Sequence, residues 1–446
     1  MALALTLKPL GSTVSAYSTA VERLEAASAP GMKPGLARIS ALLEALGRPH
    51  LGLRGALVGG TNGKGSVCAV VDAVCRAAGL RTALLVKPHL LSYCERVVID
   101  GSAIGEVDFA GLVEEVIAAG ASLSAEVGHP SQFELLTALG ILAARRADAE
   151  VVVCEVGLGG RLDSTNVLDL GVAVITNVAL DHVAILGGDV RSIAREKAGI
   201  IKPGNEVVSG ASPPASPVVR EAAERREAPL TEVSELTFSG RSRGLAGVEL
   251  RVPWAGGVLD LESLLVGRFQ LANVAVAAAA CEALRRQGFP VDAEALVAGC
   301  RSARWPGRMQ WIDQEPPLLL DGAHNPAAME ALAAEVPEIC SGRRRVAIFA
   351  AMRDKDITPM LAQLRRFADS VIFTQVAGER ALPATELAKD WRALGSEAVA
   401  IEGQTYETAV TPAAALQRAR VLARPRGVVV VCGSLYLVGD VLAELA

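Results

Sequence analysis

Short runs of apolar residues alternate along the chain with segments whose apolar positions recur at helical spacing. Strand-like runs occupy residues 55–58, 82–86, 151–156, 172–176 and 207–208, and helical patterns occupy residues 67–78, 109–119, 133–145 and 190–198. Because these strand-like runs are continuously apolar, they predict strands buried on both faces of a mostly parallel sheet. The pattern therefore predicts an α/β fold.

The pattern changes on either side of this central block. Two short helices are expected between residues 18 and 46, interrupted by Pro30-Gly31 and Pro34-Gly35. Residues 245–266 predict a small antiparallel flap, and residues 271–287 predict a long Ala-rich helix. Alternation then restarts, with strand-like runs at residues 318–320, 346–350, 371–373 and 428–431. We expect a domain boundary near Ala303, which separates residues 1–303 from a smaller domain of residues 304–446.

Composition narrows the kind of partner. The chain has 446 residues, of which 51% are apolar and 4% aromatic, and this fits two α/β domains. A net charge of -5 argues against a nucleic-acid binder, so we expect small-molecule substrates. The eight cysteines form no C-x-x-C pair, which is typical of reduced thiols in the cytoplasm. Residues 1–10 lack a signal-peptide pattern, and no apolar stretch approaches the roughly 20 residues that span a bilayer, so no membrane association is expected.

A glycine-rich loop joins the first strand-like run to the helical pattern that follows. It consists of Gly60, Thr61, Asn62, Gly63, Lys64, Gly65 and Ser66. Glycines let backbone N–H groups face phosphate oxygens, and the helix N-terminus adds its dipole. The loop departs from the usual Walker A string, because Gly65 stands where that string has Ser or Thr. A glycine turn that only packed a helix on a sheet would give Lys64 no purpose, so we favour binding of a nucleoside triphosphate.

Polar residues follow two of the predicted strands. Glu155 ends the run at residues 151–156, where open α/β sheets bind ligands, and its carboxylate suits Mg²⁺. Asp181-His182 follows the run at residues 172–176 in the same manner, which allows a metal-linked or phosphate-facing His182. A lone histidine is more often a hydrogen-bonded structural residue, so neither feature is decisive alone.

Two further segments have both a structural and a functional interpretation. Residues 196–204, which contain Lys197, have the pattern of a charged helix end. Residues 321–326 follow another strand-like run, and either Asp321 or Asn325 could simply cap the helix that starts near Pro326. Upstream, Arg308 places a fixed cation close to the predicted hinge. The pattern leaves both interpretations of residues 321–326 open.

Taken together, these residues resemble the folylpolyglutamate synthase/dihydrofolate synthase family of the Mur ligase superfamily, over about residues 17–445. Further markers are Pro88-His89-Leu90, Glu95-Arg96, Asp354-Lys355-Asp356 and residues 133–137, 155–166, 195–204, 305–308 and 433–439. The resemblance implies a P-loop-containing ATPase domain of mostly parallel sheet and a smaller Rossmann-like, glutamate-binding C-terminal domain. It also implies a monomeric ligase that uses ATP and Mg²⁺ to join L-glutamate to a reduced folate or dihydropteroate through an acyl phosphate.

The resemblance also implies roles for individual residues. ATP would lie between the domains, held by residues 60–66 with Asn273, Arg308 and Asp321, and Mg²⁺ would be held by Glu155, His182 and Ser66. Lys64, Lys197 and His324 would be catalytic, with Lys197 carbamylated. His324 and Ser434 would face the incoming glutamate, and Phe133, Glu134 and Arg161 would lie near the pterin-bearing substrate.

One position departs from the family. Members usually have Ser just before Pro88, where it is a Mg²⁺ ligand, and this chain has Lys87. A cation cannot ligate a cation. One hypothesis is that Lys87 points away while Ser66, water and phosphate complete the coordination. A second is that its ammonium neutralises charge at one metal position, and a third is that catalysis is weakened or redirected.

Several functions remain open at this point. The enzyme could be a folylpolyglutamate synthase only, a bifunctional enzyme that also makes dihydrofolate, or a relative acting on another carboxylate. A cell-wall Mur ligase is disfavoured because only about sixty residues precede the glycine loop. A non-catalytic nucleotide sensor would keep residues 60–66 without needing residues 321–326 or Ser434, and Lys87 is the feature in its favour.

Overall fold

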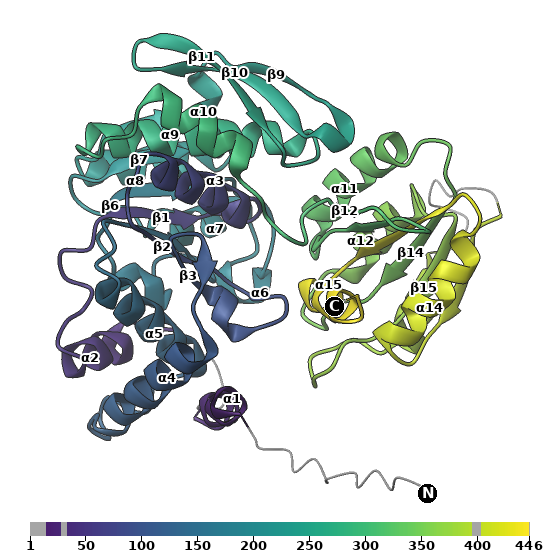
Figure 1. The fold of residues 1–446 in the computed structure, drawn as a ribbon, viewed down its shortest axis with the longest axis horizontal. Coiled ribbons are helices and arrows are strands. Elements are labelled where there is room, and N and C mark those ends of the chain that lie inside the picture. Colours follow the sequence, from purple (N-terminus) through teal and green to yellow (C-terminus); the bar gives the residue numbers. More distant parts are fainter. Residues whose placement is uncertain (1–14, 28–33, 395–402, 446) are drawn as a thin grey trace, which may run out of the picture.

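Two β-sheets, each covered by helices on both faces, form the body of the computed structural model (Figure 1). The structure describes residues 15–27, 34–394 and 403–445, and the statements below concern these residues. The expected break at Pro30-Gly31 and the expectation for residues 1–10 lie outside them.

The first sheet is mostly parallel. Its strands are β1 (Gly55–Gly59), β2 (Thr82–Leu85), β3 (Val97–Ile99), β4 (Ser102–Ala103), β5 (Val151–Glu155), β6 (Gly171–Ile175), β7 (Glu206–Ser209) and β8 (Leu230–Glu232). They run in the order β4-β3-β2-β5-β1-β6-β7-β8, and only β3 and β4, at one edge, are antiparallel to their neighbours. The α/β fold with a mostly parallel sheet is therefore confirmed.

Both faces of this sheet are buried, as the continuous apolar runs predict. In β5, Val151 and Val153 belong to one core cluster, and Val152 and Cys154 belong to the other. One face is covered by α3 (Lys64–Ala77), α9 (Phe269–Arg286) and α10 (Ala293–Ser302). The other is covered by α1 (Ala16–Ala26), α2 (Ala37–Ala45), α4 (Glu106–Ala121), α5 (Gln132–Arg146), α7 (Val190–Ala198) and α8 (Ser216–Arg225). The short α6 (Val183–Leu186) lies beside α7.

A small antiparallel sheet packs over α9 and α10. It consists of β9 (Ser239–Ser242), β10 (Val248–Trp254) and β11 (Gly257–Ser263), and it lies at the top of Figure 1. The alternating burial along β10 leaves one of its faces to solvent and packs the other on the helices. The flap expected at residues 245–266 is present and begins one strand earlier, at Ser239.

The second sheet has helices on each side of a mostly parallel core. Its strands are β12 (Gln310–Ile312), β13 (Leu318–Leu320), β14 (Arg345–Phe349), β15 (Ser370–Phe373), β16 (Thr405–Thr408) and β17 (Val428–Cys432), in the order β12-β13-β17-β14-β15-β16. One face is covered by α11 (Pro326–Ile339), α12 (Ile357–Arg365) and α13 (Ala384–Ala393), and the other by α14 (Pro412–Ala423) and α15 (Leu435–Ala443). Residues 303–309 connect α10 to β12, and the boundary near Ala303 stays a prediction.

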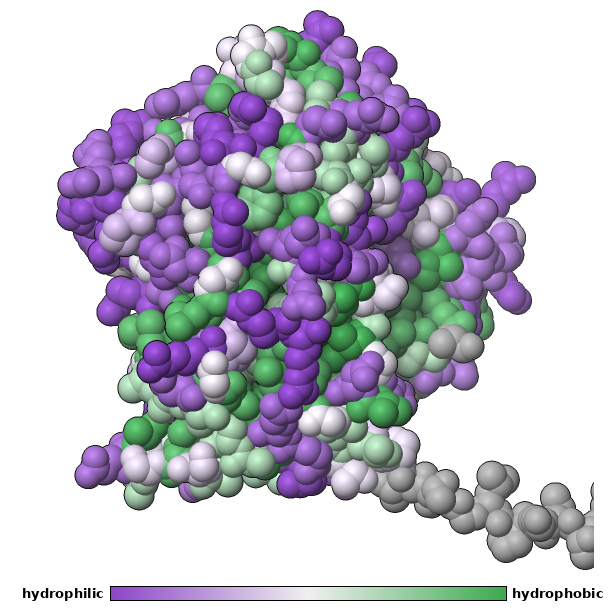
Figure 2. Space-filling view, turned by 60° about the vertical axis from the view of Figure 1, so that its left-hand side comes forward, coloured by the Kyte–Doolittle hydropathy of each residue, from purple (hydrophilic) through white to green (hydrophobic). Residues whose placement is uncertain are grey.

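The surface and the cysteines can be compared with what the composition predicts. Figure 2 shows a face on which apolar patches are separated by polar and charged residues. All eight cysteines are buried and free, as expected. Within the described ranges, no helix is both long and apolar enough to cross a membrane.

Candidate active site

A cavity of about 1050 Å³ opens between the two sheets' loops. It is lined by the glycine loop, by residues at the carboxyl ends of β5 and β6, and by residues that follow β13 and β17 in the second sheet. Carboxyl ends of parallel strands are where open α/β sheets bind ligands. The sequence-predicted site residues are brought together here, since every one of them lines this cavity.

The glycine loop is hydrogen-bonded to the side chains of the two residues that follow β6. Gly63 has a positive φ of 81°, so it takes the left-handed conformation from which α3 starts. The backbone N–H of Asn62 donates to Asn177 Oδ1 at 2.9 Å, and the Thr176 hydroxyl donates to the Asn62 carbonyl at 2.6 Å. These bonds fix the loop with the N-terminus of α3 facing the cavity, which is the geometry of an anion site.

Two lysine ammonium groups converge on this loop. Lys64 Nζ donates to the carbonyls of Gly60 and Thr61 at 3.2 and 3.1 Å, and Lys197 Nζ donates to the Gly60 carbonyl at 2.8 Å. Burial, followed by repulsion from Lys64, lowers the pKa of Lys197 to about 7. The helix α7 ends at Ala198 as the pattern predicts, but Lys197 is buried rather than solvated.

The departure from the Walker A string has a steric cause. A Cβ on Gly65 would lie 2.5 Å from Trp305 Nε1 and 2.7 Å from two of its ring carbons. The indole from the segment that connects the two sheets therefore occupies the space of a Ser or Thr side chain. The hydroxyl is displaced to Ser66, which accepts a hydrogen bond from Gln270 at 3.3 Å.

The carboxylate of Glu155 is buried at the end of β5. It accepts a hydrogen bond from the backbone N–H of Lys87 at 3.1 Å. Burial raises the pKa of Glu155, although Lys64 opposes this shift. No side-chain nitrogen of a Lys, Arg or His in the described chain lies within 4 Å of this carboxylate, which leaves a charge that a divalent cation would neutralise.

The residues present fit magnesium better than a metal that needs a full protein cage. In the described ranges, no group of three or more His, Cys, Asp or Glu side chains is arranged so that it could hold a metal ion by itself. Mg²⁺ commonly takes one or two protein oxygens and completes its shell with phosphate and water. Glu155 and Ser66, the last residue of the glycine loop, meet that requirement.

His182 has different neighbours. It sits at a positive φ of 50°, and its Nε2 lies 3.3 Å from Lys355 Nζ. Its two nearest carboxylates belong to Asp181 and Asp354, at 3.8 and 3.9 Å. Burial lowers the pKa of His182. An ammonium thus occupies the Nε2 side of the ring, so a metal could bind at Nε2 only if Lys355 moved.

The second sheet contributes two polar side chains just after β13, those of Asp321 and His324. Asp321 accepts hydrogen bonds from the backbone of Met309 and Ala323 at 2.9 and 2.8 Å. His324 Nδ1 lies 2.7 Å from the Gly322 carbonyl, which can only accept, so Nδ1 carries the proton. Burial, with Lys355 and Arg308 nearby, lowers the pKa of His324 to about 4. The neutral ring therefore offers Nε2 as an acceptor.

The remaining predicted residues line the cavity with partners of their own. Ser434 caps α15, and Asn273 Nδ2 donates to Gln270 Oε1 at 2.8 Å. Glu134 forms the capping box of α5 with Ser131 and an ion pair with Arg38, and Arg161 pairs with Glu196. Glu134 and Arg161 thus carry structural contacts in addition to facing the cavity.

Asn325 caps a helix, which is the structural interpretation of residues 321–326, and it also connects the two sheets. Its Oδ1 accepts from the backbone N–H of Ala328 and so caps α11, while its Nδ2 donates to Asn62 Oδ1 and Asp181 Oδ2, each at 3.0 Å. Lys355 adds a second connection between the sheets by donating to Asp181 Oδ1 at 2.9 Å. Neither Asn325 nor Lys355 is among the predicted site residues. Their presence in the markers Asp321–Pro326 and Asp354-Lys355-Asp356 was the available signal.

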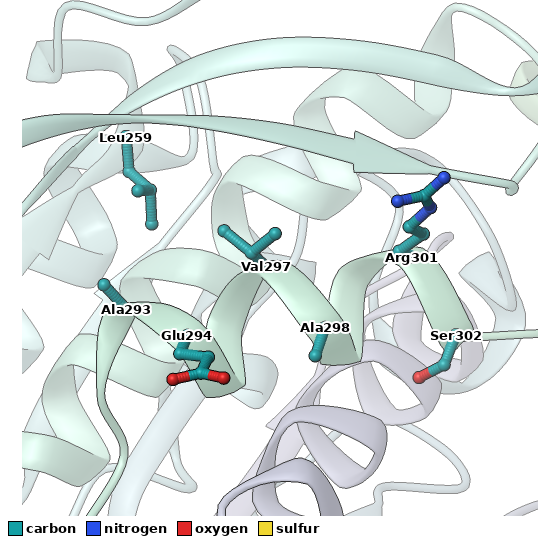
Figure 3. Close-up of a pocket in the computed structure, with 7 residues that line it drawn as sticks. All are labelled: Leu259, Ala293, Glu294, Val297, Ala298, Arg301 and Ser302. Atoms are coloured by element: carbon teal, nitrogen blue, oxygen red, sulfur yellow. The ribbon is translucent and has the colours of Figure 1, made fainter.

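A second cavity of about 730 Å³ lies between β11 and α10 (Figure 3). It is lined mainly by Leu259, Val297 and other residues of α10, and Figure 3 shows Leu259 and Val297 facing each other across it. It shares no lining residue with the larger cavity and lacks a convergent set of polar groups. The chemistry is therefore assigned to the larger one.

Comparison with known proteins agrees with this geometry. Residues 58–281 match the family described as "Mur ligase middle domain", and residues 307–435 match "Mur ligase, glutamate ligase domain". The chain is 32% identical over 421 residues to the dihydrofolate synthase/folylpolyglutamate synthase of Bacillus subtilis, covering 93% of this chain and 96% of that protein. The protein of the same name from Mycobacterium tuberculosis is 37% identical over 374 residues, covering 80% of this chain and 77% of that protein.

Solved structures give the same result. The folylpolyglutamate synthase of M. tuberculosis complexed with ADP superposes with a TM-score of 0.88 at 31% identity, covering 97% of this chain and 98% of that one. Escherichia coli FolC in complex with DHPP and ADP superposes with a TM-score of 0.84 at 30% identity, covering 98% and 99%. With these similarities across both sheets, the chain belongs to the dihydrofolate synthase/folylpolyglutamate synthase family of ATP-dependent Mur-type ligases.

Proposed function

We propose that this protein uses ATP and Mg²⁺ to join the amine of L-glutamate to a carboxylate of a reduced folate or of dihydropteroate. The observation that carries the proposal is one cavity in which the glycine loop and the unneutralised Glu155 carboxylate face the polar residues of the second sheet. The glycine loop has the geometry to bind the triphosphate of ATP. The reaction itself is inferred from the family to which the chain belongs. Nothing in the comparisons favours a non-catalytic or redirected nucleotide binder.

The first half of the reaction makes the carboxylate reactive. An oxygen of the acceptor carboxylate attacks the γ-phosphorus of ATP, the bond from that phosphorus to the β-γ bridging oxygen breaks, and ADP leaves. We assign Lys64 to the transferred phosphoryl group, because its ammonium already lies over the loop carbonyls. When bound, Mg²⁺ neutralises phosphate charge, and Glu155 and Ser66 are the residues that would hold it. His182 stays a proposed further ligand.

The second half forms the amide. The neutral amine of glutamate attacks the carbonyl carbon of the acyl phosphate, the carbon–oxygen bond to phosphate breaks, and a proton leaves with the amine's conversion to an amide. We assign His324 and Ser434 to the glutamate, with His324 Nε2 accepting a hydrogen bond from the amine. Arg308, Asp321 and Asn273 are assigned to ATP. Closure of the two halves around the acyl phosphate would exclude water that would hydrolyse it.

The proposal also covers the residues that bind the acceptor and the cellular location of the protein. We assign Phe133, Glu134 and Arg161 to the side of the cavity that receives the pterin-bearing acceptor. The acidic net charge and the eight free cysteines support a protein that works in the cytoplasm without nucleic acid or membrane partners. That it works as a monomer is proposed from the family resemblance alone.

Phosphate release is the direct test. Purified protein with ATP, Mg²⁺ and glutamate is given dihydropteroate, a reduced folate monoglutamate or no acceptor. Release with both acceptors identifies a bifunctional enzyme, and release with the folate alone identifies a dedicated folylpolyglutamate synthase. Equal release with and without an acceptor, or none at all, contradicts the proposal.

A further inference from the structure

The backbone and the side chain of Lys87 contact different residues: the backbone N–H bonds to Glu155, and the side chain contacts α5. The backbone N–H donates to Glu155 Oε2, while the side chain runs towards α5. There Nζ lies 3.8 Å from the centroid of the Phe133 ring and 3.3 Å from Thr137 Oγ1. The ammonium is therefore held by a ring face and one neutral hydroxyl, and both positions line or adjoin the cavity.

The ammonium has no anionic partner of its own. Among the described residues, no carboxylate oxygen lies within 4 Å of Lys87 Nζ. Asp163 is the acid that most strongly opposes the lowering of the Lys87 pKa by burial. Its two carboxylate oxygens already accept hydrogen bonds from the N–H of Leu158 at 2.8 Å and from the hydroxyl of Thr165 at 2.6 Å. A partly buried ammonium without an anion is costly, unless a ligand supplies one.

A second cation reinforces the same charge. Arg96 also lines the cavity, and its guanidinium donates to His89 Nδ1 at 2.9 Å and lies 5.1 Å from the Tyr93 ring centroid. It too has no carboxylate of the described chain within 4 Å. Lys87 and Arg96 repel each other electrostatically. An anion between or beside them would relieve this repulsion, so this part of the cavity favours a negatively charged ligand.

The contacts of the Lys87 side chain indicate which negative charge this is. Lys64 and Lys197 are the ammonium groups that donate to the glycine loop, whereas Lys87 Nζ contacts Phe133 and Thr137 of α5. Phe133 belongs to the side of the cavity assigned to the acceptor. We therefore expect the anion that reaches Lys87 to come from the acceptor rather than from ATP.

We propose that Lys87 binds the reacting carboxylate of the acceptor and holds one of its oxygens towards the γ-phosphorus of ATP. The Phe133 ring and Thr137 fix the ammonium, and Arg96 adds long-range attraction. This inference rests on the proposed function and assigns to Lys87 a task that an ammonium can perform and a metal ligand cannot. The chemistry of the transfer is unchanged, since Lys87 only orients an atom that attacks phosphorus.

The test measures the interaction between Lys87 and the ligand carboxylate directly. Binding of dihydropteroate and of its carboxamide, which is equal in size and neutral, is measured by fluorescence titration with ADP present and glutamate absent. Wild type should prefer the carboxylate, and Lys87→Met should lose about 10- to 100-fold of that preference. Lys87→Arg should retain most of it. Steady-state assays should show the same loss in the KM for the acceptor, with the KM for ATP within about 2-fold.

A half-buried lysine outside the cavity provides the matched control. Lys202 Nζ contacts the neutral Asn166 amide at 2.9 Å and does not line the cavity, so Lys202→Met should leave the carboxylate preference unchanged. If Lys87→Met fails to fold, Lys87→Gln and Lys87→Arg carry the comparison. Equal preference in wild type and Lys87→Met, or a change in the KM for ATP instead, overturns the inference. Absence of acceptor-dependent turnover in wild type overturns the proposed function instead.

Discussion

Asn325 and Asn62 exchange hydrogen bonds between the two sheets' loops, with Asn325 Nδ2 3.0 Å from Asn62 Oδ1 and Asn62 Nδ2 3.4 Å from Asn325 Oδ1. The first of these residues caps α11, and the second belongs to the glycine loop. Contact between the two halves of the molecule is thus made by the loop assigned to ATP.

Substitution of Asn325 can separate its two tasks. Asn325→Ser keeps a side-chain oxygen at the cap and removes the amide that reaches Asn62 and Asp181, whereas Asn325→Ala removes both. We expect Asn325→Ala to lower the free energy of unfolding by about 1 kcal/mol more than Asn325→Ser, because only Ala loses the cap. Both should increase the radius of gyration in small-angle X-ray scattering without nucleotide. Unchanged scattering in Asn325→Ser would show that the amide bridge does not hold the two halves together.

The ion pair between Lys355 and Asp181 predicts a pH dependence. Burial alone would raise the pKa of Asp181, but Lys355 and His182 outweigh it and lower the pKa to about 2, against an ordinary value of 3.8. The stabilisation is therefore present above pH 3.8 and is lost as the pH falls towards 2.

Lys355→Met should accordingly lower the free energy of unfolding at pH 7 by about 2 kcal/mol. The difference from wild type should shrink as the pH falls from 4 to 2, which urea unfolding at several pH values will measure. Lys389→Met, on the exposed side of α13, is the control and should change the free energy of unfolding by less than about 0.5 kcal/mol. A difference that is constant with pH would contradict the assignment.

Gly65→Ala tests the contact with Trp305. The added Cβ would stand 2.5 Å from the indole nitrogen, so the ring must move. We expect a loss of about 1–3 kcal/mol in the free energy of unfolding and a changed tryptophan fluorescence spectrum. Gly111→Ala in α4 is the control, because nothing lies within 4 Å of its Cβ position, and it should be neutral or slightly stabilising. Trp305→Ala should partly restore stability in the Gly65→Ala background.

Lys197 is expected to take up carbon dioxide. Its pKa of about 7 leaves much of the amine neutral at neutral pH, and the neutral amine is the form that attacks CO₂ to give a carbamate and a proton. The carbamylated fraction should rise as the pH is raised through 7, in ¹³C NMR with labelled bicarbonate. Lys197→Arg should show no carbamate signal and should lose most of its turnover. A carbamate signal that persists in Lys197→Arg would place the modification elsewhere.

The central strands could be predicted because their sequences are continuously apolar. Strands β3, β4, β8, β9, β12 and β16 are absent from the sequence prediction. The reason is visible in β16, whose residues Thr405–Thr408 are largely polar and exposed at a sheet edge, and in β4, which has only two residues. Such strands are defined by the neighbour they pair with, and pairing is not encoded in local hydrophobicity.

Contacts between residues far apart in the sequence could not be predicted from local patterns either. The glycine loop and Glu155 could be found from local pattern, because each follows a recognisable strand. The partnership of Lys355 with Asp181 joins positions 174 apart, and the space that Trp305 takes from Gly65 depends on how the connecting segment crosses α3. The family resemblance supplied the roles of Lys197 and His324, which their immediate surroundings in the sequence did not.

Asn62 links three parts of the molecule through a single residue. Its N–H is bound by Asn177, its carbonyl receives the Thr176 hydroxyl, and its side chain holds Asn325. A triphosphate that settles on the loop must share these groups or displace them. We therefore expect nucleotide binding at the loop to weaken or change the contact between Asn62 and Asn325, and so to change the distance between the two halves. Nucleotide should then alter the hydrodynamic radius of the protein before any acceptor is present.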